Sequence, residues 1–102
     1  MELKGFQRKY LRGLAHGCDP LVIIGQKGVT DALIDSVEEA LVSHELIKIR
    51  FNDFKEKDQK NEINGIIQKR CKCEMVGMIG HIAIFFRQND KKEDRVIKIP
   101  KK

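Results

Sequence analysis

The feature that most constrains the fold of this chain is a strand–loop–helix–strand pattern in its first half. Leu21–Ile24 is a continuous apolar run of mostly β-branched residues, which is typical of a strand buried on both faces. Leu46–Phe51 carries apolar residues that alternate with Lys and Arg, which predicts a second strand. Between them, Thr30 is a favourable N-cap for a helix that we expect to end near His44. This pattern predicts a βαβ unit with parallel pairing and a right-handed crossover.

The segments around this unit supply two more helices and two more strands, predicted from helical spacing and from alternation. The helices are expected over Leu3–Ala15 and from about Gln59 to Cys71, and the strands over Glu74–Ile79 and His81–Arg87. The apolar residues in Arg95–Ile99 also allow an extra C-terminal edge strand. The order α-β-α-β-α-β-β predicts an α/β protein, built as a two-layer sandwich with a mixed four-stranded sheet.

Length and charge narrow the class of protein. With 102 residues the chain is expected to be one domain, with a core over about residues 3–87 and a charged turn and tail over residues 88–102. It carries 20 Lys and Arg against 15 Asp and Glu, a formal net charge of +5. A basic excess favours polyanionic partners, because neutralising phosphates releases condensed counterions. On charge alone, nucleic-acid binding and a generic soluble protein both stay open.

The cysteines and the apolar runs indicate the compartment. An odd count of three cysteines, with a C-x-C pair at Cys71 and Cys73, does not resemble a disulfide framework and is typical of a reducing compartment. The first residues form no apolar signal segment, and no apolar run approaches the ~20 residues that span a bilayer. We therefore expect a cytoplasmic protein without a membrane partner, and we expect a monomer.

Catalytic and metal-binding patterns are absent from the sequence. The spacing of Cys71 and Cys73 is shorter than that of the usual zinc pair, and no second ligand pair lies at a suitable distance. We expect these two thiols and that of Cys18 to be buried or partly buried. No nucleophile–base signature and no carboxylate pair in an apolar setting is recognisable. The sequence therefore predicts no metal site, no cofactor and no enzymatic activity.

The loop after the first predicted strand is the first candidate for a binding site. It reads Gly25-Gln26-Lys27-Gly28, and we expect it to be exposed. Glycines let the backbone approach a ligand closely, the helix N-terminus behind the loop offers N–H groups, and Lys27 adds a cation. These properties suit a phosphate, although the loop lacks the longer Walker A pattern and the third glycine of the dinucleotide fingerprint. The same residues also suit an ordinary tight turn, and both interpretations stay open.

The second candidate is the segment Gly77-Met78-Ile79-Gly80 with His81. Its glycines are more typical of a hairpin or a β-bulge than of a binding site. A tip that lies beside the first loop would, however, also reach a nucleic-acid backbone.

The third candidate is the basic face of the first predicted helix. Lys4, Arg8 and Arg12 recur every four residues, Lys9 lies beside them, and no carboxylate intervenes. A charge run is usually only a solvated face. The second predicted helix carries acidic residues on its surface instead, and this asymmetry favours phosphate contact by the first helix.

Several of these segments together resemble the CRM domain, whose single-domain bacterial and archaeal form is called YhbY-like. The resemblance rests on Leu11–His16, Pro20–Thr30, His44–Lys48 and Gly80 with the strand Ile82–Arg87, and it covers about residues 3–87. It implies a fold similar to the C-terminal domain of bacterial translation initiation factor 3, and it implies RNA binding. Free-standing members are associated with precursors of the large ribosomal subunit, and plant members with group II intron splicing. The last strand departs from the family, with Phe85-Phe86-Arg87 where Leu-Tyr-Arg is common.

The resemblance also implies where RNA would bind, since the family's G-x-x-G loop, likened to that of KH domains, corresponds to Gly25–Gly28. The expected RNA-binding residues are Lys4, Arg8, Lys9, Arg12, Gly25, Gln26, Lys27, Gly28, Gly77, Gly80 and His81. The leading hypothesis is binding of structured RNA, in particular ribosomal RNA precursor during large-subunit assembly. The alternative is a protein-interaction adaptor that uses the sheet or the second-helix face. Binding through ~4–6 phosphates weakens steeply with salt, whereas an apolar adaptor contact does not.

Overall fold

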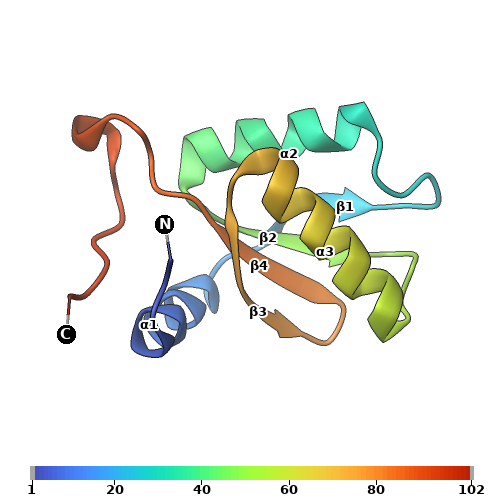
Figure 1. Ribbon diagram of the computed structural model, residues 1–102, viewed down its shortest axis with the longest axis horizontal. Helices are drawn as coiled ribbons and strands as arrows, with labels where there is room; N and C mark the ends of the chain where they lie inside the picture. Colours follow the sequence, from blue (N-terminus) through green and yellow to red (C-terminus); the bar gives the residue numbers. More distant parts are fainter. Residues whose placement is uncertain (1, 102) are drawn as a thin grey trace.

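The computed structural model describes residues 2–101 (Figure 1). In chain order its elements are α1 (Gly5–Ala15), β1 (Pro20–Ile24), α2 (Asp31–His44), β2 (Leu46–Phe51), α3 (Lys57–Cys71), β3 (Glu74–Ile79), β4 (Ile82–Phe86) and a short 3₁₀ turn, η1 (Lys92–Asp94). The sheet order is β1-β2-β4-β3, with β1 parallel to β2 and the other two pairings antiparallel. This confirms the predicted α/β class with three helices and a mixed four-stranded sheet. Over residues 2–101, no helix combines the length and the apolarity needed to cross a membrane.

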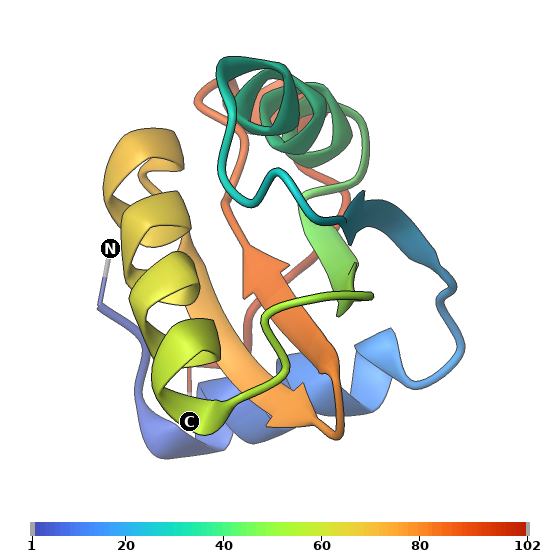
Figure 2. The ribbon, with the colours of Figure 1, turned by 90° about the vertical axis from the view of Figure 1, so that its right-hand side faces the viewer.

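Helices cover both faces of the sheet, as the views in Figures 1 and 2 show. Helices α2 and α3 pack on one face, in a core that includes Ile34, Ile67 and Phe85. Helix α1 packs on the other face, in a second core that includes Ile84 and Phe86. Strand β4 is central, so its alternating side chains enter both cores. The arrangement thus differs from the expected two layers, because α1 forms a third.

Strand β1 lies at an edge of the sheet and is not buried on both faces as its apolar run predicted. Val22 and Ile24 are buried against the α2–α3 core, whereas Leu21 and Ile23 are 51% and 49% exposed. An edge strand has one neighbour only, and α1 packs on the other three strands of the sheet, β2, β4 and β3. The far side of β1 therefore stays open to solvent.

The residues after β4 form an extended tail rather than the extra strand that Arg95–Ile99 allowed. Glu45, at the end of α2, is fully buried, and its carboxylate accepts three backbone N–H groups of the tail. The donors are Asn89 (2.6 Å), Val96 (2.8 Å) and Ile97 (3.0 Å). Because a side chain takes these N–H groups, they are not available for a strand ladder.

The three cysteines do not share the expected burial. Cys71 and Cys73 are buried at the end of α3, but Cys18 is exposed in the loop between α1 and β1. Burial, with a smaller contribution from Cys71, raises the pKa of Cys73 to about 12. Burial also raises the pKa of Cys71, with a smaller contribution from Glu38. Both thiols are therefore protonated at neutral pH, and the thiolate that would react is not formed.

Candidate functional site

The G-x-x-G loop is an exposed, hydrogen-bonded turn between β1 and α2. The N–H of Gly28 donates to the carbonyl of Gly25 (3.1 Å), which closes the four-residue turn. Gln26 and Lys27 form its tip, and both are exposed, as predicted. Gly28 has a φ of 65°, in the left-handed region, and a Cβ there would lie 3.3 Å from the ring of Phe54. The turn itself therefore requires a glycine at position 28.

Gly25 differs from Gly28, because nothing in the fold requires a glycine there. Its φ is not in the left-handed region, and a Cβ built on it would meet no atom within 4 Å. It is exposed on the same surface as Lys27. Its lack of a side chain thus leaves open space in front of the backbone, which is the condition for close approach of a ligand.

The start of α2 lies directly behind the loop. Thr30 is the N-cap, as predicted, and its hydroxyl oxygen accepts the N–H of Leu33 (3.1 Å). The positive end of the helix dipole is thereby directed toward the loop. Asp31 in the first turn opposes this charge, but its carboxylate is paired with Arg70 (3.1 Å). The site therefore combines a full positive charge on Lys27 with a partial one from the helix.

A groove of about 540 Å³ extends from the loop along β1 and the first turns of α2. Its walls are the loop, apolar residues of the edge strand and small polar or apolar residues of the helix. The lining includes Leu21, Ile23, Thr30, Ala32 and Ser36. A concave surface with a cationic rim and an apolar wall suits a ligand that has both a phosphate and a flat apolar part.

The hairpin tip lies at the same end of the sheet as the G-x-x-G loop. The end of β2 connects them: Phe51 donates its N–H to the carbonyl of His81 (2.8 Å), and Asn52 donates to that of Ile24 (3.0 Å). Gly80 has a φ of 59° in a two-residue hairpin loop, so the turn itself requires this glycine. The ammonium of Lys60 donates to the carbonyl of Gly80 (3.1 Å) and approaches Nδ1 of His81 (3.0 Å). The tip thus brings a second cation to this end.

Gly77 is not part of that tip. It follows a β-bulge in β3, where the register with β4 shifts between Met75 and Gly77. A Cβ at Gly77 would lie 2.5 Å from Cδ of Arg12. Gly77 is therefore explained by packing of α1 against β3, in agreement with the bulge interpretation.

The basic residues of α1 are of two kinds: the arginines contact the sheet, and the lysines face the solvent. Arg8 donates to the carbonyl of Met75 (2.6 Å) and to Oε2 of Glu74 (2.8 Å). Arg12 donates to the carbonyl of Val76 (3.0 Å). Both arginines thus bind groups of the bulged strand β3. The two arginines are partly exposed, and their guanidinium groups are already engaged within the fold because the helix turns this side toward the sheet edge.

The lysines of this helix region are exposed, and so are three of its apolar side chains. Lys4 and Lys9 are open to solvent. Phe6, Tyr10 and Leu14 are 40–42% exposed, while the buried residues of this region are Leu3, Leu11 and Ala15. The apolar residues of this segment lie on more than one side of the helix, and helical spacing alone does not say which side is buried.

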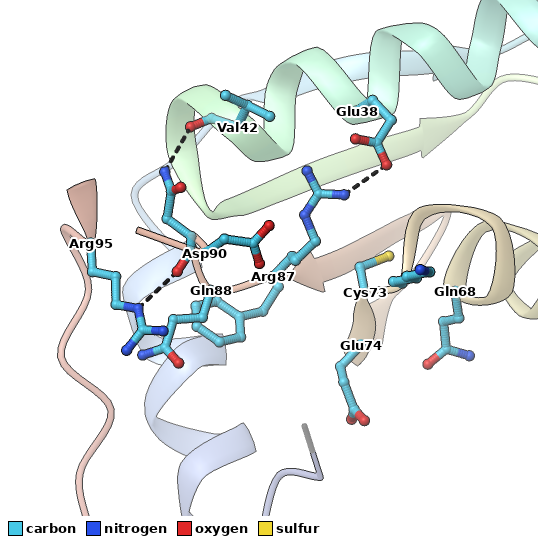
Figure 3. A pocket seen from close by; sticks show the side chains of 12 residues that line it. Glu38, Val42, Gln68, Cys73, Glu74, Arg87, Gln88, Asp90 and Arg95 are labelled. Atoms are coloured by element: carbon cyan, nitrogen blue, oxygen red, sulfur yellow. Dashed lines mark hydrogen bonds and ion pairs between the residues drawn. The ribbon is translucent and has the colours of Figure 1, made fainter. Parts of the chain in front are cut away.

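A second cavity, of about 750 Å³, lies at the opposite end of the sheet (Figure 3). Its arginines are engaged within the protein. Arg87 donates to Glu38 (2.7 Å) and to the carbonyl of Cys71 (2.8 Å), and the bond to Glu38 raises the pKa of Arg87. Arg95 donates to the carbonyl of Asn89 (2.8 Å). The contacts of these two arginines therefore fasten the tail and the helix ends to one another.

Comparison with known proteins identifies relatives over nearly the whole chain. Residues 3–87 match the sequence profile of the CRS1/YhbY (CRM) domain. The chain is 34% identical over 96 residues to an RNA-binding protein of Haemophilus influenzae, covering 94% of this chain and 93% of the relative. It is 33% identical over 98 residues to the Bacillus subtilis protein named "Probable RNA-binding protein YqeI", covering 96% and 99%. The solution structure of the Staphylococcus aureus protein SAV1595, a candidate RNA-binding protein, superimposes with a TM-score of 0.81 at 29% identity, covering 97% of this chain and all of the other.

Proposed function

Because the chain belongs to the CRS1/YhbY (CRM) domain family, we propose that it binds structured RNA, with ribosomal RNA precursor of the large subunit as its target. The names of its relatives in Haemophilus influenzae and Bacillus subtilis support RNA as the ligand. The net charge of +5 supports a polyanionic partner. The resemblance of the chain to free-standing members of the family supports the ribosomal target.

The observation that carries the proposal is the bare backbone at Gly25 beside the exposed Lys27. Gly25 and Lys27 line the same groove, so a phosphate bound there would lie near the uncovered backbone at position 25, the Lys27 side chain and the positive end of the α2 dipole. A side chain at position 25 would occupy that space without disturbing the fold. Glycine at this position therefore serves the ligand rather than the turn.

The hairpin tip gives the RNA a second contact at the same end of the sheet. Lys60 and His81 lie together there, across the end of β2 from the loop. An RNA strand that crossed this end would pass cations on both sides of β2. Contacts of this kind recognise the shape and the phosphates of RNA. Contacts with the bases would come from the groove beside β1.

Salt-dependent binding tests the role of the loop. The change Lys27→Ala should remove about one phosphate contact and lower the slope of log affinity against log salt by about 1. Lys69→Ala is the matched control, since Lys69 is an exposed lysine in the last turn of α3, whereas the Lys60 contact lies in the first turns. A protein-interaction adaptor would instead bind its partner with nearly constant affinity across the same salt range.

Crosslinking in cells followed by sequencing of the bound RNA tests the target. Enrichment of large-subunit ribosomal RNA precursor over other transcripts supports the proposal. Recovery of unrelated transcripts in proportion to their abundance would contradict it.

A further inference from the structure

Helix α1 presents two partly exposed aromatic rings to solvent. Phe6 is 40% exposed and Tyr10 is 42% exposed, one helical turn apart on the side away from the core. Leu14 continues the stripe by another turn and is also 42% exposed. An exposed large apolar side chain is unremarkable alone, but three in one line form a continuous apolar surface.

The stripe borders a shallow hollow of about 570 Å³. The lining is Phe6, Lys9, Tyr10, Gly13, Leu14 and Pro100. Gly13 contributes no side chain, and a Cβ built there would meet no atom within 4 Å. The helix backbone therefore forms an unobstructed floor beside the two rings, wide enough for a flat group to lie against them.

The rim of the hollow is positively charged. Helix α1 contains no acidic residue, and Lys4 and Lys9 are exposed on it. The C-terminal tail lies beside the helix (Figure 1), because Gln7 donates its side-chain N–H to the carbonyl of Pro100 (3.1 Å). The tail brings the exposed Lys98 and Lys101 to this neighbourhood. Aromatic rings bordered by cations on one side of a helix match the two parts of a nucleotide: the base stacks and the phosphate pairs.

We propose that this surface stacks unpaired nucleobases of the RNA that the protein binds, so that α1 acts through Phe6 and Tyr10 rather than through Arg8 and Arg12. The proposal rests on the RNA-binding function above and adds a second site on a different element. The hollow is too small for a stable contact between copies of the chain, which takes about 20–30 residues a side. Its basic rim also favours a polyanion over a neutral protein surface.

Tyr10 makes the test direct, because it is the single tyrosine of a chain without tryptophan. The emission of Tyr10 therefore reports on this surface alone, and a stacked base should quench it. The probes are a single-stranded oligoadenylate of about 12 nucleotides and a fully paired RNA duplex of similar length, each labelled for anisotropy. Single-stranded RNA should quench the tyrosine, and the duplex should not.

Substitution measures the contribution of the rings. Phe6→Ala with Tyr10→Ala should weaken binding of the oligoadenylate roughly tenfold or more, with the salt slope unchanged because no phosphate contact is lost. Tyr10→Phe should keep the affinity. Gly13→Leu keeps both rings but fills the hollow, and it should weaken binding too. Val42→Ala, which removes an exposed apolar side chain from α2, is the control and should bind like the wild type.

The outcomes separate this proposal from the RNA-binding function itself. If the wild type binds neither probe nor structured ribosomal RNA, both are wrong. If it binds RNA but the double alanine variant binds equally well and tyrosine emission is constant, the stacking surface is wrong and RNA binding stands. Self-association of the wild type that the double variant loses, with RNA affinity unchanged, would assign the hollow to a protein contact and overturn the stacking proposal.

Discussion

Glu45 allows the fold to be tested at one buried charge. Its carboxylate is fully buried and accepts three backbone N–H groups of the tail, at 2.6, 2.8 and 3.0 Å. Hydrogen bonds to charged groups contribute roughly 1.5–3 kcal/mol each. Val96, one of the donors, is 73% exposed, so water can replace part of the loss. We therefore expect Glu45→Ala to lower the free energy of unfolding by about 3–5 kcal/mol.

The substitution isolates the carboxylate, because alanine keeps the strained backbone of this position. Glu45 has a φ of 59°, and alanine at the same angle has a similar strain. Urea and thermal unfolding followed by circular dichroism measure the loss, which corresponds to roughly 15–25 °C in Tm. Hydrogen exchange of the Asn89 and Ile97 amides should accelerate. Glu39→Ala, an exposed residue of the same helix, is the control and should stay within about 0.5 kcal/mol of the wild type.

Removal of the tail gives a second comparison. In a chain without residues 88–102, the Glu45 carboxylate has lost these three donors, so Glu45→Ala should cost well below about 1 kcal/mol there. If Glu45→Ala in the full chain unfolds like the Glu39 control, the carboxylate does not hold the tail. The same conclusion follows if the substitution lowers the free energy of unfolding equally with and without the tail.

Three other predictions follow from single positions. Gly25→Ala should keep the melting temperature and weaken RNA binding measured by anisotropy. Gly28→Ala should instead lower the melting temperature, because position 28 has a positive φ and lies against the Phe54 ring. Equal melting temperatures of the two variants would contradict this. Arg12→Met should destabilise the protein by about 1–3 kcal/mol in urea unfolding, since it leaves the Val76 carbonyl without its donor; a change near zero would mean that α1 does not depend on this contact. A thiol reagent at pH 8 should modify Cys18 at once and Cys73 only as fast as the protein unfolds. Because the folded protein holds the Cys73 proton more tightly than the unfolded chain does, the corresponding stability is complete below the free thiol's pKa of about 8.5 and is lost as the pH rises to about 12.

The parts of the fold that depend on local pattern were predictable. The apolar run before Gly25, the N-cap at Thr30 and the alternation after Glu45 each act within a few residues, and they gave the βαβ unit with its parallel pairing. The position of β1 at the sheet edge was not predictable in this way. It follows from the strand order β1-β2-β4-β3, which depends on pairing between residues far apart in the chain.

In the candidate site, too, the features set by local sequence were predictable and those set by distant contacts were not. The exposure of the G-x-x-G loop follows from its place between a strand and a capped helix, and the sequence predicted it. Helical spacing around Leu11 and Tyr10 does not tell which of the two is buried. Leu11 is buried because α1 packs it against apolar residues of the sheet, and Tyr10 points away from them. The β-bulge at Val76 then turns carbonyls toward Arg8 and Arg12, and no pattern within α1 reports a bulge in β3.

The most direct test of RNA binding by the G-x-x-G loop is the affinity of the Gln26→Asp, Lys27→Asp double variant at about 50 and about 200 mM salt. A matched variant, Ser43→Asp with Lys69→Asp, changes the net charge equally on exposed surfaces of α2 and α3 that lie outside the proposed RNA contacts. We predict that the loop variant melts like the wild type, binds structured ribosomal RNA at least about tenfold more weakly than the matched variant, and has a salt slope lower by about 1. If the affinities and slopes of the two variants coincide, the loop is an ordinary turn and the account of the site is wrong.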